Sequence, residues 1–586
     1  MSREGLRAEV WPSRLALEER RRALGRDAPG GLLLAPPLFT FEGQFGLLGR
    51  MLADRPRDGL TPLAELAGPL LLHDLLRAGD WPQAWLQGPS ASRKLPHRLW
   101  RLLVQVKAAG LGPEQVAELA GEMGGERLAG LAGLLANYQV RLEELGLADE
   151  ADLLSQAEVY LSAGWRPGCL AGVSQLKVCQ ALWLRPLDLR LLRALAAFLA
   201  LEVEFGLSEP RAGRPGVWQL LRATAEALES GGLGEMDLTW RDPALEGGPL
   251  AGAGLGLLEL SPQNPPAPEL ALWRTGGRYA EVEALVSQAL SLVEAGAQPH
   301  EIALVFPDLS LYGQMAADVA RRLGLPLFFR RGLPLGSAPL VLAFLTLAEL
   351  PLLGYPRAEL GQVLESPYLA PALAAWLLGD KQAPPDGATR RLARAGYVDG
   401  RETPAAELLA RRGEDDSRLA RLCAGLSQAL TGLGVARTQD LASYLEGLSQ
   451  LWRQIARHAP PAQALPGRDG ALWVRDQAAA SALGGALAGL ARAARQVGAS
   501  QALTPGRCLA LAREGFAGVS LAEGGGVRGG VAVLRLEDAL GLRPAYLLAG
   551  GLNQGEFPPR PAAHLLAPEE RLALGRRARL PVWRTE

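Results

Sequence analysis

Two short apolar runs near the end of the chain have the pattern of neighbouring buried strands. Val531–Leu534 forms the first run and Ala545–Ala549 the second, with Gly541 and Pro544 between them and Gly551 just after. Runs this apolar are typical of strands in a parallel sheet that is covered on both faces. Open α/β sheets form crevices at the ends of their strands, so the turn-forming residues after the second run are predicted to line one.

A helix–strand–helix–strand order is predicted in the middle of the chain. Arg278–Ala295 places apolar residues, Tyr279 among them, along one side of a helix. The strand Ile302–Phe306, the helix Leu311–Leu323 and the strand Leu327–Phe329 follow. Strands that alternate with helices in this way predict a parallel sheet with right-handed crossovers.

The rest of the chain predicts a few more strands and a large amount of helix. The expected elements are a strand at Val10, a helix ending at Gly25, the strand Gly31–Ala35, helices over 60–147 of which Leu128–Gly146 is the clearest, a helix starting near Asp149, the strand Ala181–Leu184, the helix Leu187–Leu199 and the strand Leu201–Phe205. Residues 207–268 are rich in Gly and Pro and predict a linker with one helix, Trp218–Leu228. Helices are expected again at Pro339–Leu350 and over 355–500, and a loop at Gly524–Gly530.

Composition and charge indicate a multidomain globular protein with no global attraction to nucleic acid. The 586 residues are 48% hydrophobic and 21% charged, with a formal net charge of −1. A chain of this length predicts about two to four domains. Of the 61 basic residues 57 are arginine, whose planar fork binds phosphate through two hydrogen bonds. Any DNA binding must therefore come from local arginine patches, although most single arginines are expected to be solvated surface charges.

The cysteines and the apolar segments give an expected compartment. Cys169, Cys179, Cys423 and Cys508 show no Cys-x-x-Cys spacing and no disulfide framework, which favours a reducing environment. No signal peptide or membrane span is evident in the sequence. We expect a cytoplasmic protein that does not enter a membrane.

Three kinds of catalytic motif are missing from the sequence. A phosphate-binding loop needs Gly-Lys-Ser/Thr, and none of the four lysines follows a glycine. A metal-dependent nuclease with an Asp/Glu-x-Lys motif needs an acidic residue two positions before a lysine, and none of the four lysines has one. The five histidines form no pairs. We therefore expect no catalytic residue, no metal site and no cofactor, and the chain is expected not to be an enzyme.

The C-terminal motifs resemble those of a helicase family. The order strand, Ala-x-Gly541-Leu542, strand, then Gly551-Leu552-Asn553-x-Gly555-x-Phe557-Pro558 is similar to the last third of superfamily 1 helicases of the UvrD type. It is closest to the ATPase-dead AddB-type (RexB-type) subunit of bacterial helicase–nucleases. Arg278–Val305 is also similar to the start of the second helicase lobe. The strand at Ala181 is followed by Trp183-Leu184-Arg185-Pro186 where an active helicase has its magnesium-binding Asp-Glu.

The resemblance implies a fold of two RecA-like parallel-sheet lobes, ATPase-dead, each with a large helical insertion. The implied first lobe is 1–55 with 160–250, its insertion 56–159, the second lobe 251–345 with 506–586, and its insertion 346–505. His564–Glu586 resembles the region that precedes the PD-(D/E)XK nuclease domain of the family, so we expect a chain truncated before that domain.

The implied function is to hold single-stranded or forked DNA in double-strand-break processing and recombinational repair, beside an AddA-like helicase–nuclease motor. The arginines near strand ends are the candidate DNA contacts: Arg278, Arg330, Arg331, Arg528 and Arg543. Two alternatives stay open. One is a two-lobed glycosyltransferase with a donor site at Gly550–Asn553 and Glu556; the other is a protein-interaction scaffold that binds no DNA.

Overall fold

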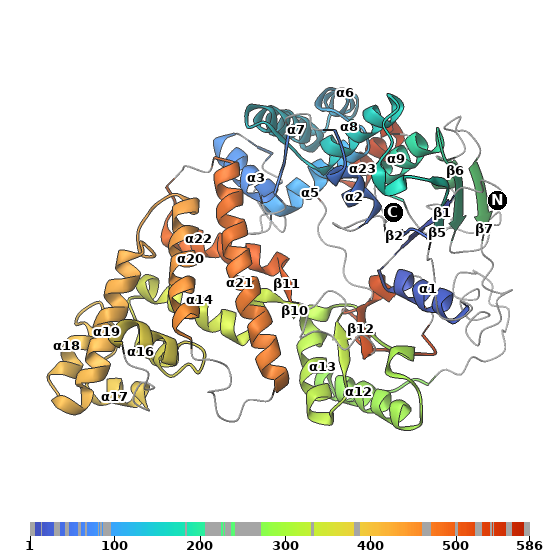
Figure 1. Cartoon of the computed structure of the whole chain (residues 1–586). Helices are drawn as coiled ribbons and strands as arrows, with labels where there is room; N and C mark the ends of the chain where they lie inside the picture. The colour runs from blue at the N-terminus through green and yellow to red at the C-terminus, as the bar shows by residue number, and fades with distance from the viewer. Residues whose placement is uncertain are drawn as a thin grey trace.

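The computed structural model of the chain describes most of its residues, and the account below is confined to them. They are 6–12, 14–27, 36–40, 46–56, 60–64, 67–79, 81–82, 85, 95–181, 184–205, 224–226, 228, 236–240, 271–329, 333–379, 387–459, 470–498, 502–521, 530–539, 542, 544–557 and 565–578. The fold is α/β and mostly helical, with two separate parallel sheets and helices around them (Figure 1).

The first sheet has five parallel strands in the order β2-β1-β5-β6-β7. Their bounds are β1 Leu6–Trp11, β2 Leu38–Thr40, β5 Val173–Ala181, β6 Ala200–Phe205 and β7 Met236–Trp240. Val10 pairs with Phe39 on one side and with Val178 on the other, and Val178 pairs with Val203. All four of these side chains are at most 2% exposed, so the middle of the sheet is buried.

Helices α1 Arg14–Asp27, α2 Leu47–Ala53, α8 Glu150–Ser162 and α9 Pro186–Ala196 pack around this sheet. Glu9 of β1 is buried and accepts hydrogen bonds from Arg20 of α1 and from the Trp11 indole, at 3.0 and 2.9 Å. Burial alone would raise the pKa of Glu9, but these hydrogen bonds outweigh it and hold the pKa below its usual value. The ion pair therefore fixes α1 against the strand that precedes it.

The chain leaves the first sheet after β2 and forms a helical region before it returns at β5. Its helices are α3 Ala67–Ala78, α5 Leu95–Ala108, α6 Pro113–Met123 and α7 Glu126–Glu144, with the short parallel pair β3 Thr61–Pro62 and β4 Leu147–Ala148 and the 3-10 turn Gly168–Leu170. α7 ends just before Gly146, whose φ of +63° suits a residue without a side chain. The helix predicted over Leu128–Gly146 thus begins two residues earlier and ends two residues earlier.

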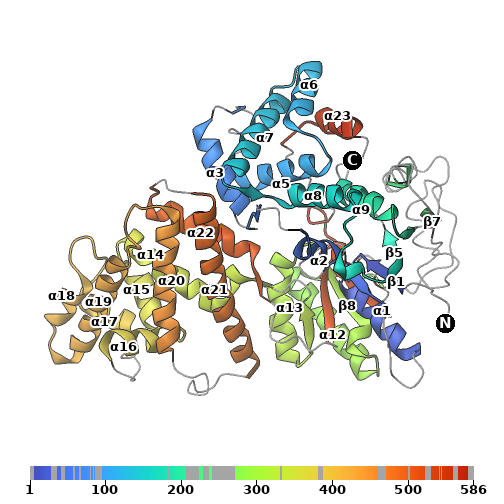
Figure 2. The same cartoon turned by 45° about the horizontal axis from the view of Figure 1, so that its top comes forward.

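The second sheet has four parallel strands in the order β13-β8-β12-β9. They are β8 Ile302–Phe306, β9 Leu327–Phe329, β12 Val531–Arg535 and β13 Tyr546–Ala549. Helices α12 Arg278–Glu294 and α13 Leu309–Leu323 lie side by side on one face of it (Figures 1 and 2). Every residue of β8 is buried, so this strand is the centre of the sheet's core.

Between β9 and β12 the chain forms a second, larger helical region. Its helices are α14 Pro339–Leu353, α15 Arg357–Leu364, α16 Ala370–Leu378, α17 Ala388–Arg394, α18 Ala405–Ala410, α19 Glu414–Gly432, α20 Leu441–His458, α21 Gly470–Gln496 and α22 Pro505–Gly518. The antiparallel pair β10 Leu333–Pro334 and β11 Ser520–Leu521 closes its base, and 3-10 turns lie at Pro299–Glu301, Leu335–Ser337 and Leu536–Ala539. The two helical regions share one continuous apolar core.

The last described helix, α23 Pro568–Ala578, returns to the first helical region and packs on α6 (Figure 2). The Trp85 indole donates a hydrogen bond to the Leu565 carbonyl at 3.0 Å, and Arg577 pairs with Glu118 of α6. Segments 459 residues apart in sequence are thereby held together.

Several strand predictions were wrong. The strand expected at Ala181–Leu184 lies earlier in the chain: β5 ends at Ala181, and Arg185 is already the N-cap of α9. Polar and apolar residues alternate in β5, and its Lys177 forms ion pairs with Glu202 and Glu204 of β6. The continuous apolar run that follows β5 was the stronger local signal for a strand. The segment expected to be a linker contains β7, a fifth strand parallel to β6. Within the helix predicted at 218–228, residues 224–226 and 228 are helical, and the others lie outside the described residues.

Burial also differs from expectation at two places in the second sheet. β13, expected to be buried on both faces, is an edge strand in which Tyr546 is 41% and Leu547 50% exposed. Tyr279, expected on the apolar side of α12, is 49% exposed, as the rest of the first turn of that helix is exposed too. The strand predicted at Gly31–Ala35 and the loop at Gly524–Gly529 lie outside the described residues. None of the described helices is long and apolar enough to cross a lipid bilayer.

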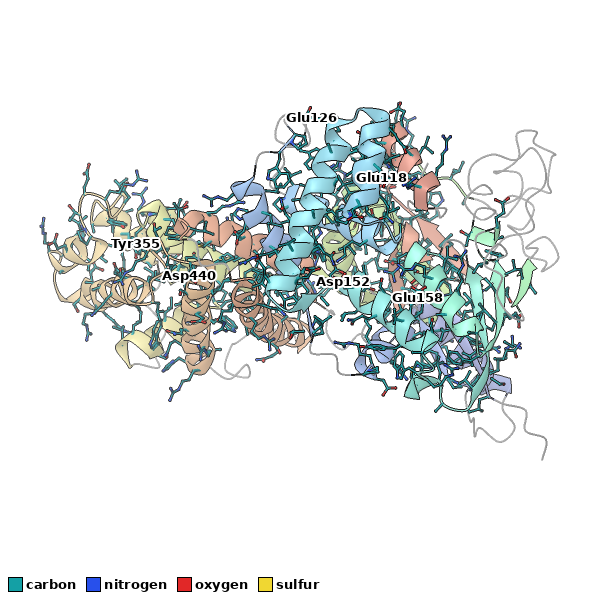
Figure 3. All side chains as sticks on the ribbon, turned by 90° about the horizontal axis from the view of Figure 1, so that it is seen from above. Glu118, Glu126, Asp152, Glu158, Tyr355 and Asp440 are labelled. Atoms are coloured by element: carbon teal, nitrogen blue, oxygen red, sulfur yellow. The ribbon has the colours of Figure 1, made fainter. Side chains whose placement is uncertain are left out.

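Lys107 forms an ion cluster with two carboxylates at the start of α8, one of which, Asp152, is labelled in Figure 3. Its Nζ lies 2.7 Å from Asp149 Oδ2 and 2.7 Å from Asp152 Oδ2, and 5.3 Å from the centre of the Tyr138 ring. Asp149 is also the N-cap of α8 and accepts the Asp152 N–H. Burial and the Asp149 carboxylate raise the pKa of Asp152 in spite of Lys107. The cluster therefore depends on its single cation.

We predict that Lys107→Met destabilises this region by about 3–5 kcal/mol, because it leaves the buried Asp149 carboxylate and the partly buried Asp152 carboxylate without a counter-charge. Hydrogen exchange of α5 and α8, together with the urea midpoint, measures the loss. Arg141→Met is the control, since the exposed Arg141–Glu144 pair contributes less than about 1 kcal/mol. Equal midpoints for the two variants would contradict the prediction.

Candidate functional site

The candidate site lies at the carboxyl edge of the second sheet, where β8 and β13 end. In parallel sheets all strands end at the same edge, and the loops that follow them form the crevice. β13 is followed by Gly550 and Gly551 and then by a turn over residues 553–557, in which Glu556 and Phe557 donate N–H groups to the Asn553 carbonyl. Together with Gly551 and Leu552, this turn contains most of the motif on which the family resemblance rests.

Two glycines allow the turn to leave the sheet. A Cβ at Gly550 would stand 2.6 Å from Leu285 of α12, and one at Gly551 would stand 2.8 Å from the Pro307 ring. Gly551 also has a φ of +75°, which L side chains rarely adopt. Its N–H donates to Glu281 Oε1 at 2.8 Å. The motif glycine is therefore required by close packing and by backbone conformation together.

Glu556 ties the turn to both helices of the sheet. Its Oε1 accepts hydrogen bonds from Arg278 Nε and Nη2 at 2.8 and 2.7 Å, and its Oε2 accepts one from the Tyr312 hydroxyl. Arg278 is the first residue of α12, and Tyr312 of α13 stacks on Phe306 at 5.0 Å between ring centres. One carboxylate thus joins α12, α13 and the turn.

These contacts shift the proton equilibria of all three groups. The hydrogen bond from Tyr312 and then that from Arg278 hold the pKa of Glu556 below its usual value. The hydrogen bond to Glu556 and its charge raise the pKa of Arg278, and burial followed by the Glu556 hydrogen bond raises that of Tyr312. Near neutral pH, Glu556 is therefore ionised, Arg278 is positively charged and Tyr312 keeps its hydroxyl proton.

The site contains one predicted DNA contact and most of the predicted fold motif. Arg278, half exposed, binds Glu556 in the turn that also contains Gly555 and Phe557; Gly551 precedes this turn, and Leu552 and Asn553 are exposed. Leu542 packs on the other face of the sheet with Ala303 and Val305. The remaining predicted residues lie outside the described part of the chain: Arg330, Arg331, Arg528, Arg543, Gly541 and Pro558.

Sequence reasoning did not find Glu281 and Tyr312, and it noted Glu556 only for the glycosyltransferase alternative. Glu281 stands three residues after Arg278, a spacing that places both on one face of a helix, but nothing in the sequence pairs them with residues near 551. The second oxygen of Glu281, Oε2, is buried with no hydrogen-bond partner among the described residues.

The polar groups of the site form charge-assisted contacts with one another. Its polar groups are one arginine fork, one tyrosine hydroxyl and two carboxylates, and the described residues contain no cluster of three or more His, Cys, Asp or Glu that could hold a metal ion. The arginine fork is the group that binds a carboxylate or a phosphate, and here it holds Glu556.

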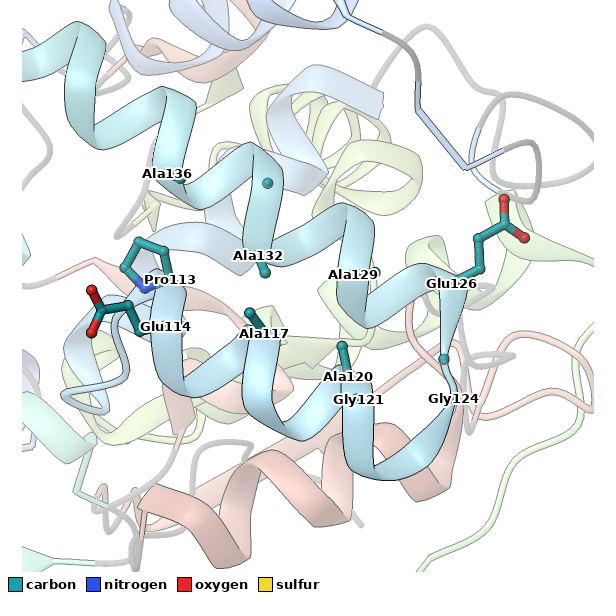
Figure 4. Close-up of a pocket in the computed structure, with 12 residues that line it drawn as sticks. Pro113, Glu114, Ala117, Ala120, Gly121, Gly124, Glu126, Ala129, Ala132 and Ala136 are labelled. Atoms are coloured by element: carbon teal, nitrogen blue, oxygen red, sulfur yellow. The ribbon is translucent and has the colours of Figure 1, made fainter.

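A groove in the first helical region lacks such groups. A groove of about 690 Å³ lies between α6 and α7, lined almost wholly by Ala and Gly, with Glu114 and Glu126 at its two ends (Figure 4). Its lining offers no converging polar side chains, so we do not place the functional site there. In comparisons with known proteins, no family model and no curated protein matches this chain.

We predict that Gly551→Ala destabilises the second sheet more than Gly555→Ala does. Both positions have positive φ, +75° and +89°, and each substitution costs about 1–2 kcal/mol for that reason. Only at Gly551 does the new Cβ also meet Pro307 and Tyr312. Urea unfolding of the two variants measures the difference. Equal midpoints would show that the close packing at Gly551 is not limiting.

The ion pair of Glu556 predicts a pH dependence. A carboxyl whose pKa is lowered on folding adds stability that is present above its unfolded pKa and is lost as the pH falls through the folded pKa. We therefore expect wild type to lose more stability than Glu556→Gln between about pH 5 and pH 3. Parallel curves for the two proteins in thermal melts across this range would contradict the assignment.

Proposed function

We propose that this chain is a non-catalytic, helicase-like subunit of the AddB type that holds single-stranded or forked DNA beside a motor and nuclease partner during double-strand-break processing. In this proposal the two parallel sheets are RecA-like lobes, and the two helical regions are their insertions. The proposal rests on the motif resemblance together with the chain order described below.

The observation that carries the proposal is the order in which the chain builds its sheets. The first sheet takes β1 and β2 from before one helical region and β5, β6 and β7 from after it. The second takes β8 and β9 from before the other region and β12 and β13 from after it. Two parallel sheets, each interrupted once by a helical excursion, are the arrangement that the resemblance implies.

The first sheet supports a holding role rather than a motor role. A phosphate-binding loop joins a strand to a helix through Gly-x-x-x-x-Gly-Lys-Ser/Thr. Here β1 ends at Trp11 and α1 begins at Arg14, so Pro12 and Ser13 are the whole connection. The sequence also has no Gly-Lys at any position.

Local arginine excess supports DNA as the ligand. Residues 434–513 contain nine arginines and four acidic residues. Arg453 and Arg457, one turn apart on α20, are both exposed, and Arg492 of α21 is exposed as well. A basic stretch on a nearly neutral protein is the kind of patch that neutralises phosphates.

The site adds an expectation for Arg278. Its fork is held by Glu556, so a DNA phosphate that binds there must compete with an internal carboxylate. Removing the charge of Glu556 should strengthen DNA binding, and removing Arg278 should weaken it.

We predict micromolar binding of labelled single-stranded and forked DNA by fluorescence anisotropy, weakening steeply as salt is raised. Glu556→Gln is expected to tighten binding about threefold to tenfold, and Arg278→Ala to weaken it by a similar factor and to lower the salt slope by about 1. Arg322→Ala is the matched control, because Arg322 of α13 pairs with Glu283 of α12 in the same way, away from the strand ends.

Absence of binding at low salt would overturn the function for this chain and favour the protein-interaction scaffold. DNA binding that neither Glu556→Gln nor Arg278→Ala changes would keep the function and remove the carboxyl edge of the second sheet from the DNA site. Tight binding of a nucleotide sugar in the same assay format would favour the glycosyltransferase alternative.

A further inference from the structure

β13 presents an unpaired edge among the described residues. It pairs with β8 on one side, and the sheet order places no strand on its other side. Gly550 donates its N–H to Val305 of β8, so along this strand the N–H and C=O groups of Leu547 and Ala549 point away from β8. Half-exposed Leu547 and Tyr546 flank these groups. An apolar edge of this kind is a template for another strand.

The segment that precedes α12 has the properties expected of a strand that would pair with this edge of β13. Ala271–Thr275 has no assigned secondary structure, and its Leu272 is 86% and its Trp273 49% exposed. Two large apolar side chains in so exposed a segment are costly to leave in water. Gly276 and Gly277 then lead into Arg278, whose side chain is already bound to Glu556 just beyond the end of β13. The segment therefore ends at the correct edge of the sheet.

The handedness of the sheet selects β13 over the opposite edge. The unit β8–α13–β9 crosses over β12, with α13 on the face that it shares with α12. A strand beside β13, followed by α12 and β8, would cross over β13 in the same direction with its helix on the same face. The two units would then have the same hand, as parallel crossovers almost always do. A strand beside β9 would require the opposite hand.

The position and length of α12 fit this crossover. α12 packs on both β13 and β8, the two strands that such a helix must cover. Five extended residues span about 13–17 Å, which matches the four residues of β13. We propose that residues 271–275 dock along the free edge of β13 as a fifth parallel strand of the second sheet.

The added strand would also position the start of α12. Gly276 and Gly277 are the only residues between it and Arg278, so docking would set the position of the first turn of α12 and with it the Arg278–Glu556 pair. The segment is thus a positioning element for the candidate site, whatever ligand that site takes.

Site-resolved hydrogen exchange on the full chain tests the proposal. If the strand forms, the Leu547 and Ala549 amides exchange slowly, within about tenfold of Leu548, whose amide faces β8. Consecutive residues of a strand direct their N–H groups to opposite sides, so the double variant Leu272→Pro/Trp273→Pro must remove one bond to β13. It is expected to speed exchange at Leu547 and Ala549 at least about tenfold while Leu304 of β8 stays protected.

Fast exchange at Leu547 and Ala549 in the wild type would overturn the proposal, since the edge would then be open. Protection that rises with protein concentration would also overturn it, because a second copy of the chain would occupy the edge. A second measurement uses cysteine pairs. Leu272→Cys combined in turn with Tyr546→Cys, Leu547→Cys and Leu548→Cys should give an intramolecular disulfide in at least one register.

The control for cross-linking is Leu272→Cys with Leu342→Cys, because Leu342 of α14 is exposed to a similar degree as Leu547 and lies on a different element. Disulfides in the control pair as abundant as in the β13 pairs would mean that the segment samples the surface at random and is not docked.

Discussion

The carboxyl edge of the second sheet depends on the space left by two missing side chains. At Gly550 and Gly551 the chain leaves β13 so close to Leu285, Phe306 and Pro307 that a Cβ would overlap them. This close approach lets the Gly551 N–H reach Glu281 and brings Glu556 to Arg278 and Tyr312. Because Gly550 and Gly551 have no side chains, the chain can make these contacts between residues more than 240 positions apart in sequence.

The same constraint explains why the site is a set of ion pairs and not an open crevice. A turn packed directly on the ends of β8 and β13 fills the place where parallel sheets commonly bind a ligand. Its carboxylate satisfies the arginine fork that would otherwise face that ligand. A helicase-like protein without ATPase activity, as proposed, does not need this crevice for a nucleotide. A turn that fills the crevice is compatible with that proposal. Recognition of DNA would then fall to surfaces that are reached without opening the site, or to displacement of Glu556.

The sequence predicted elements well where one periodicity dominates. β8 and β9 have the predicted bounds, and α12 and α13 lie within two residues of them, because continuous apolar runs and amphipathic spacing are local properties. β5 and β7 were misplaced or missed, since their polar residues are satisfied by neighbouring strands that a local pattern cannot show. The site was predicted in part. Gly551 and Arg278 were named separately, and only the fold could join them through Glu556, because that contact is tertiary.

The way in which the cores are divided has a consequence for how the chain would hold a long ligand. Each sheet has an apolar core of its own, whereas the two helical regions, which the sequence separates by almost two hundred residues, share one. Gln496 at the end of α21 bonds the Ala64 N–H and the Pro62 carbonyl of the first region. Close-packed interiors resist deformation, so one shared core is expected to make the two helical regions move together as a single body. Under the proposed function, such a body would keep separate DNA-binding surfaces in register, which a subunit that holds DNA requires.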